Sequence, residues 1–147
     1  MWADVLDQMA TYCDSHGPCQ PRGFVAAITP VIFPSMVPMW FLPFAVATGN
    51  CIIVKPSEQV PLSTRIMFKL LEQCDLPPGV VSMVNGGREV VEGICDHPGI
   101  RAVSFVGSTP VAKAVYQRGT HAGKRVQALG GAKNFVIIMP DANFEKS

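Results

Sequence analysis

Short apolar runs alternate along the chain with segments whose apolar residues recur every three or four positions. Apolar runs bounded by Gly and Pro are typical of buried strands, and a period of three to four residues is typical of helices. The runs predict strands at residues 23–29, 51–55, 80–84, 101–106, 124–129 and 135–140. The periodic segments predict helices at residues 34–48, 62–76, 88–95 and 108–119, and prolines break the first of these.

Buried strands that alternate with helices favour parallel strands joined by right-handed crossovers. The predicted fold is therefore α/β, a Rossmann-like doubly wound parallel sheet of about five strands. Residues 1–22 are predicted to be a poorly defined lead-in, and residues 23–147 a single domain. Ligands of such sheets bind beyond the carboxyl ends of the strands. The informative strand ends are then Thr29, Lys55 with Glu58, Gly107 with Ser108, and Gly130 with Gly131.

Two apolar faces are predicted to be buried. In the helix at residues 62–76, Ile66, Leu70 and Leu71 share one side, opposite charged residues, which predicts an amphipathic helix. The helix at residues 34–48 carries a cluster of large side chains that we expect to pack in the core: Met36, Met39, Trp40, Phe41 and Phe44.

Composition narrows the class of protein. The 147 residues are 48% hydrophobic and 16% charged, with a formal net charge of +1, which excludes both a basic nucleic-acid footprint and a disordered chain. Residues 23–54 carry no charge and are long enough to cross a bilayer. Because prolines interrupt them every four or five residues, we expect buried strand and helix and no membrane partner. Asp4 and Asp7 stand where a signal peptide would be basic.

The cysteines indicate a reducing compartment. They are five, an odd number, and are scattered without a C-x-x-C pair: Cys13, Cys19, Cys51, Cys74 and Cys95. This spacing favours free thiols and argues against a disulfide framework or a metal site. We therefore expect an intracellular location, either the cytoplasm or the mitochondrial matrix.

Three turns after predicted strands are candidates for binding chemistry. Ser108 and Thr109 precede Pro110 at a helix start, which is typical of N-capping and also suits a bound phosphate; a capped turn without a ligand is the alternative. Lys55 and Glu58 could bind ribose hydroxyls, or form only a solvated surface pair. The Gly-rich turn at residues 85–87 competes for the phosphate role, and the chain contains no G-x-G-x-x-G fingerprint.

Four motifs, in order and spacing, resemble the aldehyde dehydrogenase superfamily. They are ITPxxFP at residues 28–34, ATGNCIIVKPSE at 47–58, FVGST at 105–109 and ALGGAKN at 128–134. Within the superfamily, residues 96–112, 123–134 and 139–143 resemble the CoA-acylating methylmalonate-semialdehyde dehydrogenases. The resemblance implies a Rossmann-like domain that binds NAD without a G-x-G-x-x-G loop, in an enzyme that oxidises an aldehyde to an acyl-CoA.

The same resemblance implies the cofactor residues. Lys55 and Glu58 would hold the adenosine ribose, with Gln59 adjacent, and Ser108 would contact the pyrophosphate. Thr29 and Val31 would line the cofactor, and Gly130 would approach the nicotinamide. Ala128 stands where hydrolytic relatives carry a general-base Glu, which fits transfer of the acyl group to CoA.

Two departures from the family pattern predict that the chain alone is inactive. The family's oxyanion-binding Asn is replaced by Ile32, and loss of one such donor costs about 100-fold to 1000-fold in rate. The family's nucleophilic Cys lies beyond Ser147, so we expect a truncated NAD-binding domain. The alternative is a non-catalytic binding or interaction module that pairs with itself or with a full-length homologue.

Overall fold

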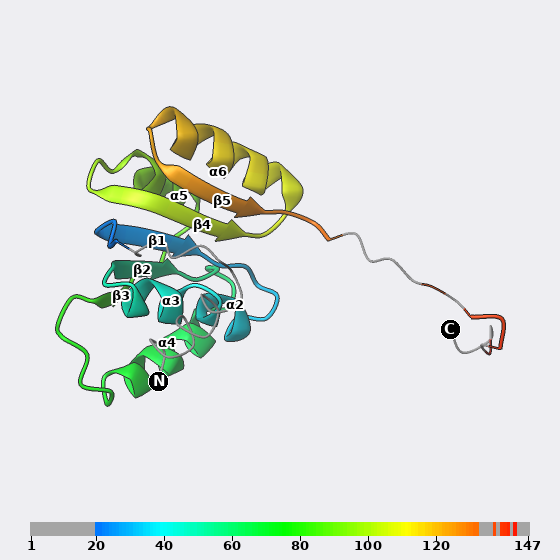
Figure 1. Ribbon diagram of the computed structural model, residues 1–147, viewed down its shortest axis with the longest axis horizontal. Helices are drawn as coiled ribbons and strands as arrows, with labels where there is room; N and C mark the ends of the chain where they lie inside the picture. Colours follow the sequence, from blue (N-terminus) through cyan, green and yellow to red (C-terminus); the bar gives the residue numbers. More distant parts are fainter. Residues whose placement is uncertain (1–19, 133–136, 138, 142, 144–147) are drawn as a thin grey trace, which may run out of the picture.

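The protein folds around one parallel sheet. The computed structural model describes residues 20–132, 137, 139–141 and 143. Its strands lie in the order β3-β2-β1-β4-β5, all parallel, as the arrows in Figure 1 show. They are β1 Phe24–Ile28, β2 Cys51–Lys55, β3 Val81–Met83, β4 Ile100–Val106 and β5 Arg125–Leu129. The predicted doubly wound sheet of about five strands is confirmed. Of the further strand expected at residues 135–140, the structure describes residues 137, 139 and 140, and none of these three lies in a strand.

The strand order reverses beside β1. From β1 the chain adds β2 and then β3 on one side, and it crosses back to place β4 and then β5 on the other. Ile28 pairs with Lys55 on one side and with Phe105 on the other, so the carboxyl ends of these three strands are level. Doubly wound sheets bind ligands in the crevice outside the carboxyl ends of the two strands at this reversal, here β1 and β4.

Helices cover both faces of the sheet (Figure 1). They are α2 Met36–Met39, α3 Leu42–Ala47, α4 Pro61–Leu71, α5 Arg88–Asp96 and α6 Thr109–His121. The break predicted in the first helical segment is present, because α3 begins anew with Pro43 in its first turn, where a missing N–H has no cost. One core cluster joins β1 and β4 to α5 and α6, and the other joins β1 and β2 to α3 and α4.

The buried face of α4 is not the predicted one. Ile66 and Leu70 are exposed, and Leu71 is half-buried. Thr64 is the buried residue of this helix, and its hydroxyl donates to the carbonyl of Pro34. Apolar residues lie on both sides of α4, so their period alone could not identify the side that meets the sheet.

The predicted Met and aromatic core cluster is also wrong in large part. Met36, Met39, Trp40 and Phe44 are exposed, whereas Phe41 packs partly buried against the core. The reason is that α2 and α3 are only four and six residues long, and each buries a narrow side, at Val37 and Leu42. Among the described residues no helix is long and apolar enough to cross a membrane.

Asn50 ties three segments together near the amino end of β2. Its Oδ1 accepts hydrogen bonds from the backbone N–H groups of Arg22 (2.6 Å) and Gly23 (3.1 Å). Its Nδ2 donates to the carbonyl of Ala45 and to the hydroxyl of Thr48 at the end of α3. This buried side chain therefore fixes where α3 ends and where β1 begins.

Lys124 has a similar role on the other half of the sheet. Its ammonium donates to the carbonyls of His97, which caps α5, and Ile100, the first residue of β4. The residue is 7% exposed, which is unusual for lysine. Sequence reasoning did not identify either buried polar residue.

Candidate functional site

The predicted site residues follow four adjacent strands at one edge of the sheet. Glu58 comes after β2, Thr29 after β1, Ser108 after β4 and Gly130 after β5. Neighbouring strands lie about 4.8 Å apart, so three spacings place the first and last of these strand ends about 14 Å apart. The edge therefore presents the four residues as a row that crosses the point at which the strand order reverses.

Lys55 and Glu58 form an ion pair at one end of this row. The Lys55 Nζ lies 3.0 Å from Glu58 Oε2. Lys55 is only 3% exposed, so the expected alternative of a solvated pair does not describe it, whereas the Glu58 side chain is 59% exposed. A backbone N–H bond and the bond from Lys55 hold the pKa of Glu58 below its ordinary value. The result is an ionised carboxylate that faces solvent and is held in place from behind.

Gln59 is exposed beside this pair, and its backbone N–H donates to the Ser57 hydroxyl. This bond closes the turn between β2 and α4 on the side chain of Ser57, which is itself buried. The Ser57 hydroxyl therefore helps to hold this turn in addition to the Lys55–Glu58 pair.

Ser108 occupies the N-cap position of α6, with Pro110 in the first turn as predicted. The hydrogen bond expected of a capping serine is absent in the described part of the helix, since the Ser108 side chain bonds to none of its backbone N–H groups. The first N–H groups of a helix have no partner within the helix. The start of α6 therefore offers a hydroxyl and backbone donors toward the edge of the sheet.

A hydrogen bond joins the turn after β5 to the start of α6. The N–H of Gly131 donates to Thr109 Oγ1 at 3.0 Å. A Cβ at Gly130 would lie 3.2 Å from the Thr109 Cα and 3.1 Å from its Oγ1, closer than ordinary contact. A side chain at position 130 would therefore push against Thr109, and glycine avoids this contact. Thr109 is a positioning residue that the motif alone did not reveal.

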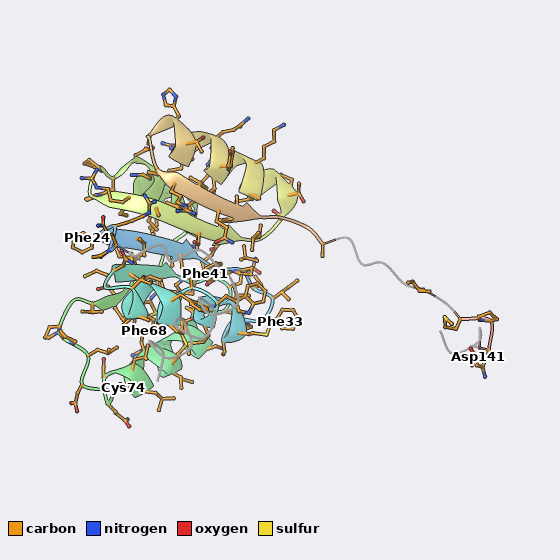
Figure 2. The ribbon with its side chains drawn as sticks, in the orientation of Figure 1. Phe24, Phe33, Phe41, Phe68, Cys74 and Asp141 are labelled. Atoms are coloured by element: carbon orange, nitrogen blue, oxygen red, sulfur yellow. The ribbon has the colours of Figure 1, made fainter. Side chains whose placement is uncertain are left out.

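The segment after β1 presents apolar side chains at the same edge. Thr29 is buried, and its N–H donates to the carbonyl of Lys55, which extends the ladder by one residue. Val31, Ile32 and Phe33 are exposed, Ile32 at 67%. Phe33 has a φ of 55°, a left-handed conformation that costs a non-glycine residue about 1–2 kcal/mol. Figure 2 shows its ring beyond the carboxyl ends of the strands.

The turn at residues 85–87 lies next to Glu58, away from Ser108. Gly86 has a φ of 152°, and a Cβ there would lie 2.3 Å from a methyl of Val90. Asn85 and Gly86 line a pocket of about 270 Å³ together with Glu58 and the first turns of α4. This turn is the competing phosphate candidate, and its position makes it a neighbour of the Glu58 end of the row.

The described residues form no metal site, and their larger hollow lies away from this edge of the sheet. No cluster of three His, Cys, Asp or Glu side chains there could hold a metal ion. A larger hollow of about 650 Å³ lies over the sheet face between Trp40, Phe44, Ser104 and Gln127, and the strand ends do not line it. The candidate site is the row at the carboxyl ends.

Comparison with known proteins gives consistent matches. The sequence profile of the aldehyde dehydrogenase family matches residues 9–147. A malonate-semialdehyde dehydrogenase of Pseudomonas aeruginosa is 50% identical over 91% of this chain and 27% of its own length. Malonate-semialdehyde dehydrogenase 1 of Oceanobacillus iheyensis is 49% identical over 100% of this chain and 30% of its own length.

Two solved structures extend the match to the fold. The methylmalonate-semialdehyde dehydrogenase of Oceanimonas doudoroffii has a TM-score of 0.81 and 51% identity, covering 86% of this chain and 26% of its own. A structure from Sinorhizobium meliloti, complexed with NAD, has a TM-score of 0.81 and 46% identity, covering 89% and 28%. This chain spans 30% or less of the length of these relatives.

Proposed function

Because the chain belongs to the aldehyde dehydrogenase family, we propose that it is the NAD-binding portion of a CoA-acylating (methyl)malonate-semialdehyde dehydrogenase. The resemblance of its motifs to this family is confirmed by the comparisons. The observation that carries the proposal is the row of strand ends. Glu58, Ser108 and Gly130 follow β2, β4 and β5 in the order ribose, pyrophosphate and nicotinamide that the resemblance assigns to them.

In this proposal each end of the row binds a different part of the dinucleotide. The Glu58 carboxylate accepts hydrogen bonds from the ribose hydroxyls, while Lys55 holds that carboxylate in place from the buried side and Gln59 flanks it. Ser108 and the first N–H groups of α6 donate to the pyrophosphate.

The middle and the far end of the row complete the proposed site. The Thr29 backbone and the exposed Val31 side chain line the cofactor between the two ends. Gly130 permits close approach at the nicotinamide end. The bound NAD supplies the hydride acceptor.

We propose further that the nucleophile comes from outside this chain. A cysteine thiolate of the complete enzyme would attack the aldehyde to form a thiohemiacetal, and loss of hydride to NAD would oxidise this to a thioester. The acyl group would then pass to the thiol of CoA, which frees the cysteine. Burial raises the pKa of the Cys95 thiol, and Cys51 begins β2 at the opposite edge from the row. Ile32 offers no donor to an oxyanion, and Ala128, whose methyl packs against the core, offers no base to activate water. We therefore expect no turnover of a semialdehyde with NAD and CoA by the chain alone.

Titration calorimetry with NAD and NADP tests the site. Glu58→Gln should weaken NAD about tenfold and NADP less, because the lost carboxylate binds ribose hydroxyls but repels a 2′-phosphate. Ser108→Ala should weaken both equally, because the pyrophosphate is common to them. Glu72→Gln at the far end of α4 is the matched control and should change neither affinity. Equal losses at Glu58→Gln would refute the ribose role, and no binding by the parent chain would refute the proposed function.

The second candidate is a non-catalytic module that pairs with itself or with a full-length homologue. The exposed apolar residues of α2 and α3 favour it, since contiguous apolar surface marks interaction sites.

For either function we propose a reducing intracellular compartment, the cytoplasm or the mitochondrial matrix. The described cysteines, Cys51, Cys74 and Cys95, support this proposal because they are free thiols.

A further inference from the structure

The pocket beside Glu58 contains a cation to which neither the sequence motifs nor the comparisons give a role. Its volume is about 270 Å³, and it is lined by Glu58, Pro61, Leu62, Arg65, Asn85 and Gly86. These residues come from the turn after β2, the first turns of α4 and the turn after β3. The pocket is thus the outer neighbour of the proposed ribose site, on the side away from Ser108.

The charges around this pocket do not cancel. The Glu58 carboxylate is paired with the ammonium group of the buried Lys55, which lies 3.0 Å away. Arg65 is exposed, and its guanidinium forms no ion pair or hydrogen bond with any residue that the structure describes. Among the described residues, the pocket therefore contains one carboxylate that is already paired with a lysine and a second cation, Arg65, that has no partner there.

We infer that Arg65 is a specificity-determining residue that lets this pocket accept a phosphate on the ribose 2′ oxygen. The inference rests on the proposed function, in which Glu58 binds the ribose hydroxyls. A 2′ substituent that extends past Glu58 would enter the pocket, where the carboxylate repels a phosphate and the guanidinium attracts it. Guanidinium groups suit phosphate because their N–H donors match its oxygens in pairs.

The consequence is a weaker preference for NAD than Glu58 alone would impose. A carboxylate beside a 2′-phosphate disfavours NADP, and a guanidinium in the same pocket offsets that repulsion. Arg88, which follows the turn at residues 85–87, is the rival cation. It is bonded to Glu92 at 2.6 Å and does not line the pocket, so it does not explain the binding of a phosphate there.

Titration of the full chain with four nucleotides tests this role: NAD, NADP, adenosine 5′-monophosphate and adenosine 2′-monophosphate. Arg65→Ala should weaken NADP and adenosine 2′-monophosphate about tenfold, the effect expected for one charge-assisted contact at an exposed site. It should change NAD and adenosine 5′-monophosphate less than about twofold. Arg65→Lys should retain part of the affinity for the 2′-phosphate, because the charge is kept and the paired geometry is lost.

Two control variants separate this role from a general effect of charge. Lys69→Ala removes a cation one turn further along α4, outside the pocket, and Arg88→Ala removes the rival. Neither should discriminate between the two monophosphates. A larger 2′-specific loss in Arg88→Ala than in Arg65→Ala would overturn the assignment, as would equal losses for all four nucleotides in Arg65→Ala. Binding of NAD without any binding of NADP would overturn it and leave the proposed function intact. No binding of any nucleotide would refute both.

Discussion

Replacement of Lys124 by methionine tests whether one buried cation holds the amino end of β4 to the end of α5. The Lys124 ammonium donates to the carbonyls of His97 and Ile100, 2.8 Å away in the second case. Methionine keeps most of the length and volume of the side chain and removes only the donors. Any stability lost by the variant therefore comes from the missing hydrogen bonds and charge, and a cavity does not contribute to it.

The expected cost follows from the two bonds. A hydrogen bond from a charged donor contributes about 1.5–3 kcal/mol, and two of them give about 3–6 kcal/mol. The variant also avoids the desolvation cost of burying an ammonium group, and this gain offsets part of the lost hydrogen-bond energy. The carbonyl of His97 still accepts a hydrogen bond from the N–H of Ile100, so the variant does not leave it without a donor. We expect a net destabilisation of about 2–3 kcal/mol, which for a chain of this size lowers the Tm by about 4–12 °C.

The assay is thermal unfolding followed by circular dichroism, with Lys113→Met as the matched control. Lys113 lies exposed on α6, so the same substitution there should change stability by less than about 0.5 kcal/mol. Lys124→Arg should fall between the parent and Lys124→Met, because a charged donor remains. If Lys124→Met and Lys113→Met melt together, the Lys124 bonds contribute no net stability and its role as a tether is refuted.

Two further predictions concern the site and the α5–α6 contact. Thr109→Val removes the acceptor of the Gly131 N–H, and we expect faster hydrogen exchange at the Gly131 amide with α6 otherwise unchanged; unchanged exchange would contradict the positioning role of Thr109. Arg118 donates two hydrogen bonds to Asp96, at 2.7 and 2.8 Å, and these bonds lower the pKa of the Asp96 carboxyl. The contribution of this pair to folding stability should therefore be complete above the ordinary carboxyl pKa and should be lost as the pH falls through the lowered pKa. Arg118→Ala should flatten that decline in acid unfolding curves, and the control Arg88→Ala, whose partner is Glu92, should leave the Asp96 contribution in place.

Sequence patterns predicted the sheet and the site edge because both depend on local signals. The runs that became β1 and β2 carry no charge before Lys55, and Gly or Pro bounds them, so their ends could be predicted closely. Once parallel strands are expected, their carboxyl ends must share an edge. Glu58 and Ser108 could therefore be placed at one edge without any knowledge of their neighbours.

Tertiary partners determine what the patterns missed. Ile66 and Thr64 lie two positions apart on α4, and only the sheet beneath decides that the threonine is buried. Lys124 could not be distinguished from a surface lysine, because its acceptors lie 24 and 27 residues earlier in the chain. Phe33 has a left-handed φ of 55°, which a phenylalanine rarely adopts and which no sequence signal predicts.

The face of β4 and β5 opposite α6 leads to a last prediction. In the described part of the chain no helix packs there, and a hollow of about 650 Å³ lies between exposed Trp40 and the outward side chains of Arg125 and Gln127. Apolar surface next to an uncovered sheet face favours association. We therefore expect the chain to self-associate as its concentration rises, with Trp40 near the centre of the contact.

Sedimentation velocity over a range of concentrations measures this association. Trp40→Glu should weaken it about thirtyfold, the effect of losing about 2 kcal/mol at a buried aromatic contact. Ile66→Glu is the control, because it places the same charge on another exposed apolar residue, on α4 and away from the hollow. If Ile66→Glu dissociates the chain and Trp40→Glu does not, the contact lies on α4. A parent chain that stays monomeric at every concentration would refute this prediction.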